Sequence, residues 1–210
     1  MKEIKRYSPV VLKATPLKSE VRDNWNVVLE YHGEGEGPYL VDLSHRTRLD
    51  LQSSDLASKN PFGISVPEVP CQSVLENGIL VNRMNGTQTS VYDLTAGDLE
   101  KPGEVEYTDV TENTLFVAIM GQAVFSICEK LSALDFMAPG KQAPFLYQGP
   151  FSHVPCQIVT LSREGQKSGV VLTCSRGYGK DMIHSILNAG EEFGLKPAGE
   201  TRFTEWVASL

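Results

Sequence analysis

Three cationic side chains follow one apolar segment near the start of the chain and form its densest group of residues able to do chemistry. His45, Arg46 and Arg48 come directly after the run 39–43, which also carries Asp42. An apolar run of this kind predicts a strand, so the cations would gather at one strand end. There they could bind a ligand that carries a carboxylate. The alternative is a solvated loop with local salt bridges, the more common outcome because exposed ion pairs are frequent and weak.

Two glycine-rich segments look like nucleotide-binding loops but lack the residues that such loops need. In the segment 174–181, Cys174 stands at the first glycine position of a phosphate loop and Asp181 replaces the required hydroxyl residue. A carboxylate there would repel phosphate. In the segment 33–38, Pro38 occupies the last glycine position of a dinucleotide fingerprint. Both segments are therefore interpreted as turns.

His153 and Cys156 have the spacing of half a zinc site. Zinc takes about four ligands, and no second pair stands at a supporting spacing. We therefore expect no metal site.

The length, composition and net charge are those of an ordinary globular protein. The chain has 210 residues, 41% of them hydrophobic and 21% charged, and a formal net charge of -7. A surface of that sign repels phosphate backbones, so nucleic acid is not expected as a partner. The opening residues 1–9 are polar and basic, and no run approaches the ~20 apolar residues of a membrane helix. The chain is therefore expected in the cytoplasm, away from membranes, with its four cysteines as buried free thiols.

The first half of the chain predicts strands at 26–31 and 39–43, then a long surface connection at 57–70. Two further apolar runs, 79–83 and 89–94, flank Asn85-Gly86, a dipeptide typical of a β-hairpin turn because both residues tolerate positive φ.

The second half gives a clearer order of elements. Strands are expected at 115–120, 156–161 and 169–174, and helices begin near Val124 and Met182. Gly190 is expected to end the second helix in the left-handed conformation, and 201–206 to form a last strand. This is the β-α-β-β-α-β order of a ferredoxin-like layer, so the predicted class is α+β, with both helices on one face of an antiparallel sheet.

The domain organisation is expected to be a single unit over 1–210. Within it two lobes can be drawn, one made of 1–60 with 111–210 and the other a hairpin-bearing lobe at 61–110.

Four segments, read together, resemble the family of the glycine-cleavage T-protein (aminomethyltransferase) and the sarcosine oxidase gamma subunit. They are the segment 39–49, which begins Tyr39-Leu40-Val41-Asp42-Leu43-Ser44-His45, the run 115–131, the segment 131–136 and, most specifically, the segment 186–199, which begins Ile186-Leu187-Asn188-Ala189-Gly190-Glu191-Glu192-Phe193-Gly194-Leu195-Lys196-Pro197. The resemblance implies a T-protein-like folate-binding fold.

The chain departs from the catalytic members of that family at two positions. Those members carry an Asp-Asp pair before a strand that corresponds to 79–83, whereas this chain has Asn77-Gly78, with Glu76 as the nearest carboxylate. Val171 stands where the family has a glutamate that grips the pterin ring. Catalytic members also continue into a carboxy-terminal domain, and this chain ends at Leu210, soon after the shared segment.

The resemblance therefore implies a non-catalytic subunit or binding module of one-carbon and amine metabolism, like the gamma subunit of heterotetrameric sarcosine oxidase. Its partners would be flavin-containing oxidase subunits, or further copies of itself. Two alternatives stay open. One is a stand-alone tetrahydrofolate-dependent aminomethyl- or methyltransferase that uses displaced carboxylates such as Glu76 and Asp42. The other is a homo-oligomeric scaffold without a ligand.

Tetrahydrofolate is the one cofactor that the resemblance names. The candidates for binding it are Asp42, His45, Asn77, Arg83 and Tyr178.

Overall fold

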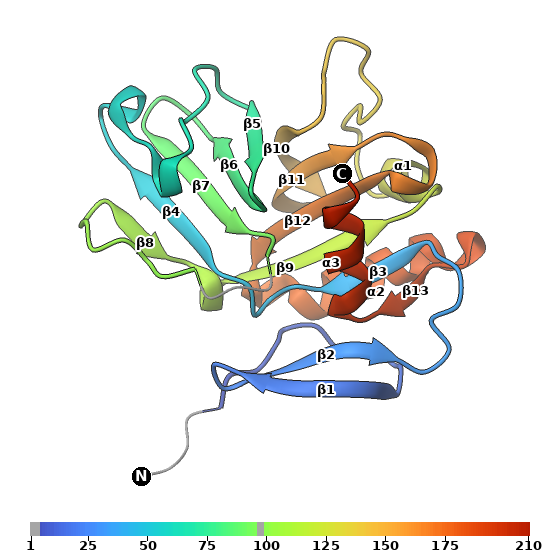
Figure 1. Cartoon of the computed structure of the whole chain (residues 1–210). Helices are drawn as coiled ribbons and strands as arrows, with labels where there is room; N and C mark the ends of the chain where they lie inside the picture. The colour runs from blue at the N-terminus through green and yellow to red at the C-terminus, as the bar shows by residue number, and fades with distance from the viewer. Residues whose placement is uncertain (1–4, 96–98) are drawn as a thin grey trace.

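The computed structural model of the protein describes residues 5–95 and 99–210. In this part of the chain the strands form three sheets, joined by three α-helices and several short 3₁₀ turns. Figure 1 shows the five-stranded sheet at the left, the six-stranded sheet at the right, and a two-stranded hairpin below them. The architecture is α+β, as predicted.

The six-stranded sheet forms the centre of the molecule. In spatial order its strands are β10 (Phe145–Phe151), β11 (Val154–Ser162), β12 (Gly169–Ser175), β9 (Thr114–Met120), β3 (Tyr39–Asp42) and β13 (Lys196–Ala198). β9 pairs antiparallel with β12, so two of the runs expected as strands are neighbours in the sheet. β3 lies between β9 and β13, antiparallel to the first and parallel to the second. The ferredoxin-like layer thus carries one strand inserted from the first half of the chain.

Two helices, α1 (Val124–Glu129) and α2 (Gly179–Gly190), cover one face of this sheet, as predicted. Alternate residues of β9 point to that face, and Val117 belongs to the same buried cluster as Ile127 of α1 and Ile183 of α2. The alternation follows from the two-residue period of a strand. The even-numbered residues of β9 point to the opposite face.

The five-stranded sheet packs against that opposite face. In spatial order its strands are β5 (Ser73–Glu76), β6 (Ile79–Arg83), β7 (Gln88–Asp93), β4 (Arg48–Gln52) and β8 (Tyr107–Asp109). β6 and β7 pair antiparallel around Asn85-Gly86, so the predicted hairpin is confirmed. Tyr92 of β7 and Phe116 of β9 meet between the sheets, with ring centroids 5.3 Å apart. The space between the two sheets is therefore a packed core.

The third sheet is a hairpin of β1 (Pro16–Arg22) and β2 (Trp25–Tyr31). Helix α3 (Glu200–Ala208) contacts β2 and β3, and Figure 1 shows it in front of the central sheet and above the hairpin. The strand predicted at 201–206 is therefore wrong. Phe203 and Trp206 stand three positions apart, the spacing of one helix face, and Phe203 is fully buried.

Helix α2 ends at Gly190, as expected, but the left-handed conformation expected at this glycine is wrong. Gly190 keeps a right-handed conformation at φ -87, and the chain continues through a 3₁₀ turn at Glu191–Phe193 before Gly194 adopts φ 71. A Cβ atom on Gly190 would lie 2.4 Å from Leu195 Cδ2, so this glycine makes room for a neighbouring side chain. Gly194 ends this 3₁₀ turn in the left-handed region that was expected at Gly190.

Within the described residues every helix is too short or too polar to span a lipid bilayer. Residues 1–4 of the polar opening segment lie outside the described part of the chain. The division into two lobes stays a prediction.

Candidate functional site

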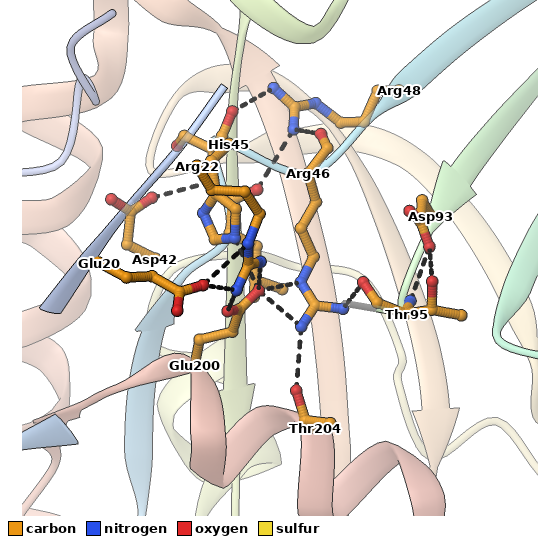
Figure 2. A network of polar contacts seen from close by, with 12 residues as sticks. Glu20, Arg22, Asp42, His45, Arg46, Arg48, Asp93, Thr95, Glu200 and Thr204 are labelled. Atoms are coloured by element: carbon orange, nitrogen blue, oxygen red, sulfur yellow. Dashed lines mark hydrogen bonds and ion pairs between the residues drawn. The ribbon is translucent and has the colours of Figure 1, made fainter. Parts of the chain in front are cut away.

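The cations that stand out in the sequence surround one buried carboxylate, that of Glu200. His45 Nε2 lies 2.7 Å from Glu200 Oε1, and Arg46 Nη2 lies 2.8 Å from the same oxygen. Arg22 of β1 approaches from the hairpin, with Nη2 2.9 Å from Oε2. Figure 2 shows these side chains converging from three separate elements. We call Arg22, His45, Arg46 and Glu200 the Glu200 cluster.

Local structure places Glu200 at the first position of α3. Gly199 has extended backbone angles and lies so close to β2 that a Cβ atom on it would be 2.1 Å from Leu29 O. Its N–H donates to Glu34 Oε1 at 2.8 Å. Glu200 itself is 2% exposed. A carboxylate in the first turn of a helix also has a favourable interaction with the helix dipole.

The surroundings fix the protonation state of Glu200. Burial alone would raise its pKa, but the hydrogen bonds from His45 and Arg22 and the positive charge of Arg46 bring the pKa down to about 2. The carboxylate is therefore ionised at neutral pH. Burial also lowers the pKa of Arg46, although the charge of Glu200 opposes that shift. An arginine keeps its charge in proteins, so this part of the interior holds an ion network.

Arg46 connects the cluster to the five-stranded sheet. Its guanidinium donates to the carbonyl oxygen of Thr95 and, at 3.1 Å, to Thr204 Oγ1, and it lies 4.9 Å from the ring centre of Phe203. Asp93, at the end of β7, is also close enough to favour the charged form of Arg46. Burial raises the pKa of Asp93, and the bonds from Thr95 partly offset that rise. The cluster thus links all three sheets through α3.

Arg48 has a different role from its two neighbours. Its side chain is fully buried, and its guanidinium donates to the carbonyl oxygens of Leu43, Ser44, Arg46, Thr111 and Thr114. Burial lowers the pKa of Arg48 to about 10. The side chain therefore satisfies carbonyl groups of the tight connection between β3 and β4 and of the segment that leads into β9.

The candidate residues from the sequence fall into two groups. Asp42 and His45 lie at the cluster: Asp42 Oδ1 accepts the Ser44 N–H at 2.9 Å, and Figure 2 shows both. Asn77 and Gly78 form the tight turn between β5 and β6, with φ values of 50 and 75. This turn packs on Thr95, because a Cβ on Gly78 would lie 2.4 Å from Thr95 Cγ2. Thr95 therefore lies between this turn and Arg46, which donates to its carbonyl oxygen.

The other candidates lie away from the cluster. Glu76 is exposed at the end of β5. Arg83 donates to carbonyl oxygens of Pro67, Asn85 and Gly86, so it supports the β6–β7 hairpin. Tyr178 is 48% exposed in the turn before α2. The structure does not bring these three together with His45.

Sequence reasoning missed the central residue, Glu200, because it assigned 201–206 to a strand. The helical spacing of Phe203, Trp206 and Val207 after Gly199-Glu200 was the available signal. From the sequence, His45, Arg46 and Arg48 were expected either in a solvated loop or against a bound ligand. They are buried instead, and the carboxylate that His45 and Arg46 bind belongs to the chain.

An open cleft of about 510 Å³ lies along a different face of α3. Tyr39 and Trp206 provide aromatic surface, and Arg202 and Glu205 provide charge. The volume falls in the usual range for small-molecule sites. In the described residues no three His, Cys, Asp or Glu side chains gather as a metal site would need.

The arrangement has one clear chemical property. Arg22, His45 and Arg46 all contact the Glu200 carboxylate, so a ligand carboxylate at this place would have to displace Glu200. Val171 stands where the resembled family has a pterin-binding glutamate. Its side chain is 1% exposed in the core between the sheets. These two features do not fit a bound folate at those positions.

No family model and no curated protein matches the sequence. Solved structures do match. A chain of heterotetrameric sarcosine oxidase from Corynebacterium sp. U-96 aligns with a TM-score of 0.60 and 15% identity, covering 73% of this chain and 84% of that one. The glycine cleavage system aminomethyltransferase T from Bartonella henselae aligns with a TM-score of 0.59 and 12% identity, over 88% of this chain and 56% of that one. The predicted T-protein-like fold is confirmed, and identities this low show the fold alone.

Proposed function

We propose that this chain, with its T-protein-like fold, is a non-catalytic subunit of a multi-subunit enzyme of amine and one-carbon metabolism. In this role it resembles the gamma subunit of a heterotetrameric sarcosine oxidase, and its partners are flavin-containing oxidase subunits. The fold match to a chain of a heterotetrameric enzyme supports the multi-subunit part of the proposal.

One observation carries the non-catalytic part: the Glu200 carboxylate occupies the centre of the cation cluster. Glu200 receives hydrogen bonds from Arg22, His45 and Arg46, which leaves it engaged as an acceptor rather than available as a base. Displacing the Glu200 carboxylate to admit a ligand would leave buried positive charge without a counter-ion, which costs a few kcal/mol. An internal carboxylate at this place is therefore a structural element.

The turn at Asn77-Gly78 supports the same conclusion. Its backbone has positive φ at both residues, and neither side chain carries a charge that could hold or deprotonate a reacting amine. Val171 likewise contributes apolar packing beside Leu80 and Leu146, where a buried carboxylate would need a partner.

Isothermal titration of tetrahydrofolate into the purified chain, without oxygen, tests the proposal. We expect no saturable binding, whereas an aminomethyltransferase T measured in parallel should bind. In a second experiment the tagged chain is purified from its native host, and flavin absorbance is measured in the co-purified fraction. We expect a flavoprotein at a fixed ratio to the chain.

Two results would overturn the proposal. Saturable folate binding together with aminomethyl transfer, abolished by Glu76→Gln, would identify a stand-alone enzyme. A homo-oligomer without flavin and without folate binding would identify a scaffold.

A further inference from the structure

Two of the four cysteines lie directly opposite each other in the central sheet. The antiparallel register of β11 and β12 pairs Cys156 with Cys174. Residues opposite each other in such a ladder have Cα atoms ~4.5 or ~5.5 Å apart, depending on the hydrogen-bonding type of the pair. A disulfide accepts Cα separations of ~4.4–6.8 Å. The Cα spacing of either kind of pair therefore falls within the range of a disulfide.

The surroundings of the two sulfurs distinguish them chemically. Cys156 Sγ donates to Val154 O at 3.3 Å, and Cys174 Sγ lies 3.6 Å from Ser175 O, both at the ends of their strands. Hydrogen bonding between the two thiols lowers the pKa of Cys174 and raises that of Cys156. Cys174 is thus the better nucleophile of the pair, since the thiolate is the reactive form.

A small oxidant has access to this end of the strands. Cys156 and Cys174 are each 5% exposed, and both contribute to the lining of an open surface pocket of about 470 Å³. The remaining cysteines lack a partner thiol at this site: Cys128 is fully buried in α1, and Cys71 lies in the connection before β5.

We propose that Cys156 and Cys174 form a redox-active dithiol that reacts with peroxides and closes to an intrachain disulfide. The Cys174 thiolate attacks one oxygen of hydrogen peroxide, the O–O bond breaks, and the departing hydroxide takes up a proton to form water. Cys174 becomes a sulfenic acid. The sulfur of Cys156 then attacks the sulfur of Cys174, the S–O bond breaks, and a second water leaves with the thiol proton of Cys156. Two thiols are oxidised and one peroxide is reduced.

Peptide mapping after peroxide treatment of the native chain tests this proposal. Trypsin cleaves after Arg163 and Lys167, so the two cysteines fall in different peptides unless a disulfide joins them. We expect a joined peptide that is lighter by two hydrogen masses than its separate parts and that dithiothreitol separates. In Cys156→Ser the sulfenic acid on Cys174 should persist and react with dimedone, whereas in Cys174→Ser the residue Cys156 should label far more slowly.

Cys71, which is only partly buried, reports whether the oxidant was delivered. If Cys71 is oxidised while Cys156 and Cys174 remain free thiols in the folded chain, the proposal is wrong. It is equally wrong if the joined peptide forms only in urea. A Cys71→Ser variant should form the joined peptide as the unaltered chain does.

Discussion

His45 and Glu200 are 155 positions apart in the sequence, and His45 Nε2 lies 2.7 Å from Glu200 Oε1. This contact joins the end of β3 to the first turn of α3. With Arg22 and Arg46 it makes Glu200 the point at which the hairpin, the central sheet and the last helix meet.

The first prediction concerns the stability that this carboxylate provides. Glu200→Gln should lower the free energy of unfolding by about 3 kcal/mol, because it leaves buried cations without their counter-ion. Urea denaturation measures the change. Glu205→Gln is the matched control, since Glu205 is exposed on the same helix and its ion pair with Arg202 spans 3.9 Å. Its effect should stay within about 1 kcal/mol. Equal effects of the two substitutions would contradict the structural role of Glu200.

The second prediction concerns acid. The pKa of Glu200 is about 2 in the folded chain against an ordinary value of 4.5. Because the folded-state pKa is the lower one, the stabilisation is fully present above pH 4.5 and is lost as the pH falls towards 2. The loss from this group should approach about 3 kcal/mol. Unfolding free energies measured across this window should therefore fall more steeply for the unaltered chain than for Glu200→Gln. If the unfolding free energies of the two proteins fall in parallel with pH, a group other than Glu200 causes the acid sensitivity.

The third prediction uses small carboxylates as substitutes for the missing side chain. Glu200→Ala leaves Arg22, His45 and Arg46 around a space where a carboxylate stood. Sodium formate should therefore raise the melting temperature of this variant, because it binds the folded state alone. Sodium chloride at the same ionic strength controls for screening. The unaltered chain should show no difference between the two salts. A formate effect of the same size in the unaltered chain would rule out binding at the cluster.

The fourth prediction concerns how closely α3 approaches β2. Gly199→Ala would bring a Cβ to within 2.1 Å of Leu29 O, although its backbone angles suit any residue. The helix start must then shift, at a cost of about 1–3 kcal/mol. Gly140→Ala is the control, because a Cβ there meets nothing within 4 Å. The shift should also weaken the Glu200 cluster, so Glu200→Gln should cost less in the Gly199→Ala background. Additive effects would show that the two positions are independent.

Long apolar runs were the most predictable part of the fold. The runs at 115–120 and 169–174 form neighbouring strands because each is buried on both faces, so no polar residue interrupts the pattern. The strand β10 was missed, since Gly149 and Pro150 weaken its local signal. It lies at the edge of its sheet, where proline is tolerated. The strand β1 was missed because it is almost entirely exposed and carries no apolar alternation.

Only half of the site could be predicted from the sequence. The cations His45 and Arg46 stand next to each other in the sequence, so their local density marked them. Their carboxylate comes from a helix 154 or more positions later, and no local pattern connects the two segments. Glu34 and Arg22, which support and complete the cluster, were missed for the same reason. Long-range pairing of charges is set by the tertiary packing, which a single sequence does not display.

Because the residues of the cluster are far apart in the sequence, they are synthesised at different times. A ribosome adds ~5–20 residues per second, so the helix that carries Glu200 follows His45 and Arg46 by roughly ten seconds or more. Through that interval the end of β3 has its cations but lacks the carboxylate that makes their burial favourable. The same strand awaits β13, its parallel neighbour, which precedes α3 by one residue. The β13 side of β3 therefore stays without its partner strand until the last segment of the chain has been made.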